Sequence, residues 1–116
     1  MNLAGDRATL AQALDAVPDI TGYADVPPML NVGDAWPRCA GGIADGAPGS
    51  FTITWKISVI TGAEPGPGME FLDMHLAPLL DAIGWHAYVP SWAPVEFQTA
   101  NAGVLYGVEI TAEKES

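Results

Sequence analysis

The sequence feature that most constrains the fold is an alternating stretch, FTITWKISVIT, at Phe51–Thr61. Most of its odd positions are large and apolar, and most of its even positions are polar. Successive side chains of a β-strand point to opposite faces, so this alternation makes one apolar and one polar face. β-branched and aromatic residues, which pack well on a half-buried sheet, fill most of the stretch. It therefore predicts the central strand of an antiparallel sheet.

Length and composition predict a single domain over residues 1–116. The chain has 116 residues and is 49% hydrophobic, which is enough to build a core. The single cysteine, Cys39, excludes an internal disulfide and suits a reducing compartment. The N-terminus has no signal-peptide pattern, and no apolar run approaches the roughly 20 residues of a membrane-spanning helix. We therefore expect a soluble, intracellular protein without membrane association.

The charge balance argues against nucleic-acid binding. Four Lys and Arg residues stand against fourteen Asp and Glu residues, which gives a net charge of −10. Such a surface repels phosphate groups, so it does not favour a basic DNA- or RNA-binding patch. The acids are spread from Asp6 to Glu115 and do not form a disordered acidic tail.

Two segments have the spacing of amphipathic helices. Residues 3–17 carry apolar side chains at three-to-four spacing, and Asn2 is placed to cap the start. Residues Met69–Ile83 form the second helix, in which Pro78 removes a backbone hydrogen bond on the outward face. The buried stripe expected for this second helix comprises Met69, Leu72, Leu76, Leu79, Leu80 and Ile83.

Shorter strands are expected around the central one. They are predicted at Ile20–Val26, Trp36–Ile43, Val95–Thr99 and Val104–Thr111, with a frayed end at Ala112–Ser116. A glycine-rich connection at Ala44–Ser50 suggests a hairpin between the second of these strands and Phe51–Thr61. The expected fold is α+β, with an antiparallel sheet of four to five strands and two helices packed on one face.

The sequence contains no pattern typical of a catalytic, cofactor or metal site. GAEPGPG at Gly62–Gly68 lies where phosphate-binding loops lie, but it lacks Gly-Lys-Ser/Thr, and its prolines remove amide donors. His75 and His86 do not have metal-ligand spacing and are expected at the surface. Cys39 is expected to be a small buried residue, although a nucleophilic role with one of the histidines stays open.

The tryptophans are the more informative side chains. Trp55 belongs to the apolar face of the central strand, and we assign Trp85 to the core. Trp36 and Trp92 lie beside prolines and loops, where they either anchor an interface or cover the ends of the sheet. The candidate interface residues are Met29, Trp36, Asp45, Glu64, Trp92 and Phe97.

The order of these segments resembles a known family. The chain opens with a helix that continues into LAQALDAVPDITGYA, and GDAWP follows at Gly33–Pro37. The strand FTITWKISVI, the helix MHLAPLLDAIG at Met74–Gly84 and the strand GVLYGVEIT at Gly103–Thr111 come next. This arrangement is similar to the tail-terminator proteins of long-tailed (siphovirus) phages. The resemblance covers nearly the whole chain. It rests on the order, length and residue pattern of the segments, without a catalytic signature.

The resemblance implies a structural virion protein with no enzymatic activity and no cofactor. Such proteins form a homo-oligomeric ring, a hexamer, at the head-proximal end of the tail tube. The ring stops tube growth, contacts the major tail-tube protein and joins the head–tail connector protein. It is assembled in the host cytoplasm, and DNA passes through its lumen without specific binding. An acidic lumen wall suits that passage because it repels the duplex.

Two other functions remain open at the level of sequence. A head-closure protein, a head-to-tail adaptor or a tail-tube protein has similar size and can share the α+β core. A small intracellular enzyme or ligand-binding domain is the alternative from another class. In the ring, we expect the connections Ala44–Ser50 and Gly62–Gly68 to project towards a neighbouring subunit or the lumen, so shortening either should harm assembly more than folding.

Overall fold

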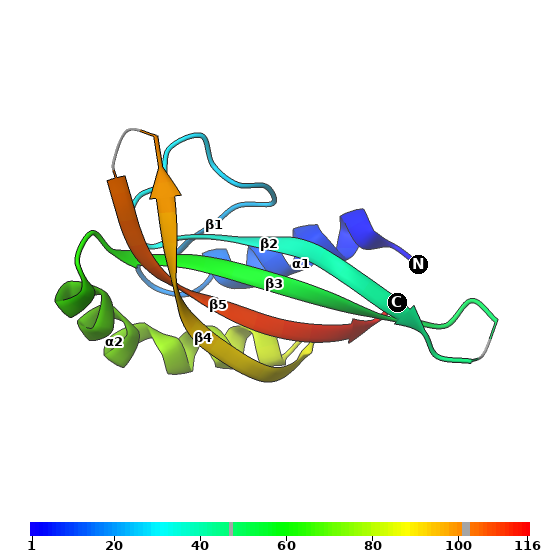
Figure 1. Ribbon diagram of the computed structural model, residues 1–116. Coiled ribbons are helices and arrows are strands. Elements are labelled where there is room, and N and C mark those ends of the chain that lie inside the picture. The colour runs from blue at the N-terminus through cyan, green and yellow to red at the C-terminus, as the bar shows by residue number, and fades with distance from the viewer. Residues whose placement is uncertain (47, 101–102) are drawn as a thin grey trace.

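A computed structural model describes residues 1–46, 48–100 and 103–116. The elements in chain order are α1 (Leu3–Asp15), β1 (Thr21–Gly22), β2 (Asp34–Ala44), β3 (Phe51–Gly62), α2 (Pro65–Gly84), β4 (Tyr88–Thr99) and β5 (Gly103–Glu115). The strands form one five-stranded sheet in the order β1-β2-β3-β5-β4 (Figure 1). The pair β1–β2 is parallel, and the other neighbouring strands are antiparallel. The expected α+β class is confirmed, with a mixed rather than purely antiparallel sheet.

The central position of β3 is also confirmed. This strand pairs with β2 on one side and with β5 on the other. Its alternation decides its orientation, because Trp55, Ile57 and Val59 are buried on one face while Thr54 and Lys56 are partly exposed on the other. A one-residue slip would bring the polar set into the core, so the pattern also fixes the register.

Both helices cover the same face of the sheet, which we call the helix-covered face (Figure 1). Leu10 and Leu14 of α1 and Leu79 and Ile83 of α2 are completely buried there. Each such side chain contributes about 1.5–3 kcal/mol through removal of apolar surface from water. The buried core on this face comprises Leu10, Leu14, Val17, Ile20, Ala35, Ile53, Trp55, Ile57, Val59, Leu79, Ile83, Val108, Ile110 and Ala112.

Helix α1 is capped as expected but is shorter than predicted. The Asn2 side chain accepts a hydrogen bond from the Gly5 amide at 3.1 Å. The helix ends at Asp15, whose carboxylate accepts a hydrogen bond from the Gly22 amide at 3.1 Å. Val17 is buried just beyond the helix, whereas Leu3 is partly exposed and does not belong to the buried core.

Helix α2 begins earlier than predicted. Pro65 occupies its first position, where a missing N–H costs nothing and the fixed φ favours the helix. Gly68 lies in the first turns and packs against β3, since a Cβ there would be 3.1 Å from Thr61 Oγ1. The segment expected as a projecting connection is therefore mostly helix, and only residues 63–64 link β3 to α2. Met69 is exposed, so its assignment to the buried stripe was wrong.

The predicted strand Ile20–Val26 is reduced to the two residues of β1. Thr21 and Gly22 pair in parallel with Asp34 and Ala35 at the start of β2. A Cβ on Gly22 would lie 2.1 Å from a backbone oxygen of α1, so glycine is what allows the chain to pass this close to the helix.

The last two strands are longer than predicted. β4 runs without a break through Pro90 and Pro94 because it is an edge strand, where a missing N–H does not break the sheet. A register shift between Tyr88 and Ser91 accommodates the first proline. β5 continues to Glu115, and its Ala112 is fully buried. The expected frayed end was therefore wrong.

A smaller apolar cluster lies on the opposite face of the sheet, which we call the open face. Its buried members are Trp36, Ile60 and Leu105, and Tyr23, Leu30 and Phe97 pack against it. The end of β4 bends over this face (Figure 1), so the Phe97 ring centroid is 5.9 Å from that of Trp36. Gly107 makes room for this, because a Cβ there would be 2.6 Å from the Phe97 ring.

Candidate interaction surfaces

The six predicted interface residues divide into two groups. Trp36 is 9% exposed and packs with Phe97, so both belong to the small cluster on the open face rather than to a free surface. The other four are exposed and lie far apart along the chain. Three are in connections, and one is in a strand: Met29 between β1 and β2, Asp45 after β2, Glu64 before α2 and Trp92 in β4. The Asp45 carboxylate accepts a hydrogen bond from Thr52 Oγ1 at 2.9 Å.

The most exposed tryptophan is one that the sequence assigned to the core. Trp85 follows the last residue of α2 and is 86% exposed, so that assignment was wrong. Tyr88 at the start of β4 is also exposed, and Trp92 is 45% exposed. Exposed aromatic side chains therefore run from the end of α2 into the outer strand of the sheet, as is typical of interface anchors.

The second half of β2 forms a free edge, which we call the β2 edge (Arg38–Ala44). β1 pairs only with Asp34 and Ala35, so within the described residues no strand lies beside the rest of β2. Every residue of the β2 edge is exposed. An exposed edge strand presents unpaired backbone groups that can accept another strand.

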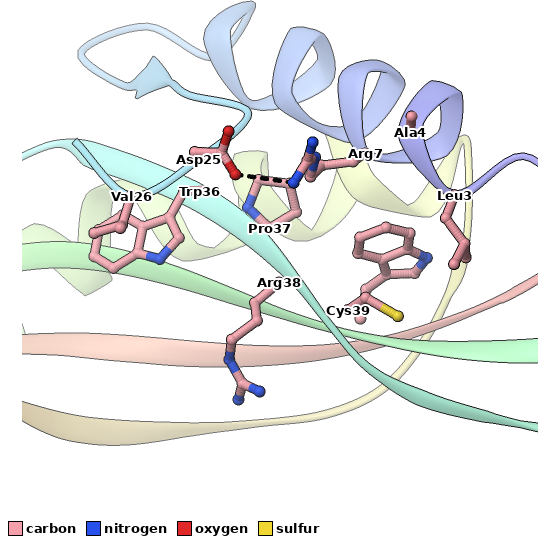
Figure 2. A pocket seen from close by; sticks show the side chains of 10 residues that line it. Leu3, Ala4, Arg7, Asp25, Val26, Trp36, Pro37, Arg38 and Cys39 are labelled. Atoms are coloured by element: carbon pink, nitrogen blue, oxygen red, sulfur yellow. Dashed lines mark hydrogen bonds and ion pairs between the residues drawn. The ribbon is translucent and has the colours of Figure 1, made fainter.

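A cleft of about 490 Å³ lies on the helix-covered face between α1 and β2 (Figure 2). Arg7 and Asp25 form an ion pair at 2.9 Å on one side of it, whereas the Arg38 side chain points away from α1 (Figure 2). Cys39 lines the cleft and is exposed, so its expected burial was wrong. Trp55 also lines the cleft, and its buried Nε1–H has no acceptor among the described residues.

The open face is basic beside the β2 edge and acidic further across. Arg38 lies directly opposite Lys56 of β3, and like charges in that position repel. Lys56 Nζ is 2.8 Å from Thr111 Oγ1 and 3.8 Å from a carboxylate oxygen of Glu109. Arg38 has no ion-pair partner within the described part of the chain. Arg38 is therefore available to pair with an acidic partner.

The other outer edge of the sheet is the first part of β4, which we call the β4 edge (Tyr88–Pro94). A second cleft, of about 500 Å³, lies beside it on the helix-covered face. Leu72 and Leu76 of α2 line this cleft together with Trp92, and Asp73 is the acidic side chain there. Each edge of the sheet thus adjoins a cleft beneath one of the two helices.

The residues considered for chemistry are not brought together. His75 is buried, with Nε2 3.2 Å from an Asp19 carboxylate oxygen and Nδ1 3.0 Å from the Phe71 carbonyl oxygen, so its expected surface position was wrong. His86 is exposed, and neither histidine lines the cleft of Cys39. Among the residues that the structure describes, no three His, Cys, Asp or Glu side chains are grouped as metal ligands.

Comparisons with known proteins do not assign a family. No protein-family model matches the chain, and no curated protein matches its sequence. No helix in the described ranges has the length and apolar character required to cross a membrane.

Proposed function

We propose that this chain is a structural virion protein, the tail terminator of a long-tailed phage. In this role it forms a homo-oligomeric ring, a hexamer, at the head-proximal end of the tail tube. The ring stops tube growth by covering the last ring of the major tail-tube protein, and its other side joins the head–tail connector protein.

One observation carries this proposal: in the part of the chain that the structure describes, the sheet has two free edges of different chemistry on opposite sides of the subunit. The β2 edge carries Arg38, and the β4 edge carries Trp92 and two prolines. A closed ring is built from head-to-tail contacts, which require two different patches on each subunit. A symmetric dimer would need only one patch that matches itself.

The net charge of −10 supports the same role. An acidic lumen repels the phosphates of the genome, so DNA passes without being held. The mutual repulsion also keeps free subunits soluble before assembly in the host cytoplasm.

Electron microscopy of the purified chain mixed with purified tail tubes tests this function. We expect rings in the free protein and one ring at a single end of each tube, with tube lengthening stopped. Rings that stack into continuous tubes would identify a tail-tube protein instead. Binding to the head connector without binding to the tube would identify an adaptor, and a chain that stays monomeric and leaves tube ends bare would contradict the proposal.

A further inference from the structure

We propose that the β4 edge of one copy docks against the β2 edge of a second copy, so that the sheet continues from subunit to subunit. The cleft beside β2 would then be covered by a second copy of this chain. This inference rests on the proposed ring and identifies the surfaces that close it.

The strand directions permit this continuation. β2, β3, β5 and β4 follow one another in the sheet, and each neighbouring pair is antiparallel. β2 and β4 therefore run in opposite directions. A second copy placed beside the first in the same orientation brings its β2 edge antiparallel to the β4 edge, which is the more stable of the two strand pairings.

The register gives the two edges one common row, and in a placement without a shift along the strands residues 38–41 face residues 88–91. Ala35 stays paired with β1, so the contact ends before it. Thr111 of β5 pairs with Ser91 on one side and with Lys56 on the other. Lys56 pairs in turn with Arg38, so Ser91 and Arg38 lie on one row across the sheet. When the sheet continues into a second copy, its Arg38 therefore lies next to Ser91, whose short side chain leaves space for the guanidinium.

The adjacent row brings an aromatic side chain to the cleft. Trp92 pairs with Ile110, which pairs on its other side with Ile57. Ile57 pairs in turn with Pro37, so Trp92 and Pro37 lie on one row across the sheet. These residues share the helix-covered face, where Pro37 lines the cleft beside β2. Trp92 of one copy is thus placed at the mouth of the second copy's cleft.

The charges of the open face fit the same arrangement. Glu109 and Glu113 lie on β5, one strand inward from β4, on the face that Thr111 also occupies. Adjacent strands are about 4.8 Å apart, so the Arg38 side chain of a second copy can extend over Ser91 towards these carboxylates. Attraction to these carboxylates would offset the repulsion that Arg38 experiences from Lys56 of the second copy.

Pairing of either edge with itself is less favourable. Pro90 and Pro94 have no N–H, so two β4 edges placed together would lack donors. Two β2 edges placed together would bring the Arg38 and Lys56 side chains of both copies into one interface. The mixed contact contains one β4 edge and one β2 edge, so it lacks half as many donors as the first pairing and holds half as many cations as the second. This difference favours a head-to-tail assembly over a two-fold dimer.

The single native cysteine makes the contact testable. Cys39 lies on the β2 edge and is exposed, and Ala93→Cys adds one thiol on the β4 edge while it leaves Trp92 in place. Treatment of this variant with a short bismaleimide cross-linker should give a ladder of covalent dimers, trimers and larger products. The wild-type chain, with Cys39 alone, should give no cross-linked product. Met74→Cys, on the exposed outward side of α2, is the matched control and should give no ladder.

Two further measurements keep the outcomes distinct. Circular dichroism confirms that each variant is folded, and Pro90→Cys replaces Ala93→Cys if the latter unfolds. Light scattering reports the oligomeric state before cross-linking. Oligomers without a ladder would overturn this contact and leave the ring intact, and wild-type dimers linked through Cys39 would show the two-fold pairing instead. A chain that is monomeric at every concentration would overturn both proposals.

Discussion

The helix-covered face of the sheet and its two edges differ in where their apolar and charged side chains lie. Ile57 and Leu79 are completely buried between the sheet and the helices, whereas Arg38 is exposed and Trp92 is half exposed at opposite edges. Burial of the first pair stabilises the subunit. The second pair contributes little to the isolated subunit. In the proposed assembly, stability of the fold and association depend on separate residues, so mutations should change one without the other.

The largest expected effect is in the core. Ile57→Ala should lower the free energy of unfolding by about 2–5 kcal/mol, because the site is fully buried and the change leaves a cavity. Urea unfolding followed by circular dichroism measures this change. A loss below about 1 kcal/mol would mean that this face is not the packed core.

The next prediction compares the loss of stability on substitution of two tryptophans. Trp36→Ala should cost about 3 kcal/mol of stability, because the ring packs on Phe97 in the small cluster of the open face. Trp92→Ala should cost less than about 1 kcal/mol in the monomer, because the side chain is half exposed. Urea unfolding of both variants at a concentration where the chain is monomeric makes the comparison, and equal losses would remove the distinction between face and edge.

A smaller effect is expected at the start of α1. Asn2→Ala should lower the free energy of unfolding by about 1 kcal/mol, since it removes the hydrogen bond that the Asn2 side chain accepts from the Gly5 amide. Asn2→Ser is the matched control and should retain most of the stability. If both substitutions lowered stability equally, the cap would not be the cause.

The smallest effect on stability is expected at the β2 edge. Arg38→Glu should change the free energy of unfolding by no more than about 0.5 kcal/mol, because the residue is exposed. The same change should weaken self-association by about tenfold or more, because it places a carboxylate opposite the acids of the neighbouring copy. Arg38→Lys should retain most of the association, and sedimentation analysis of the three proteins measures the difference.

The sequence predicted the parts of this fold that depend on local pattern. The alternation of Phe51–Thr61 specified the central strand, and helical spacing located both helices. β4 was predicted only from residue 95, because Pro90 and Pro94 are compatible with a strand only at a sheet edge, and edge position is a tertiary property. The start of α2 was missed because Pro65 was interpreted as part of a loop, although proline also favours the first helical position.

The candidate site was less predictable for the same reason. The exposures of Trp36 and Trp85 depend on the path of β4 over the open face and on where α2 ends, neither of which local sequence indicates. Arg38 was missed because its significance comes from the strand register that places it opposite Lys56. The shortage of basic residues in an acidic chain was the only signal that could have drawn attention to it.

A mixing experiment tests most directly the claim that association uses two different edges. Arg38→Glu disables the β2 edge, and Trp92→Asp disables the β4 edge. Each variant alone should be monomeric by native mass spectrometry. An equal mixture retains one intact contact, between the β4 edge of the first variant and the β2 edge of the second, so it should give a heterodimer and nothing larger. A mixture that stays monomeric while the wild-type chain forms oligomers, or variants that still form rings alone, would contradict association through two different edges.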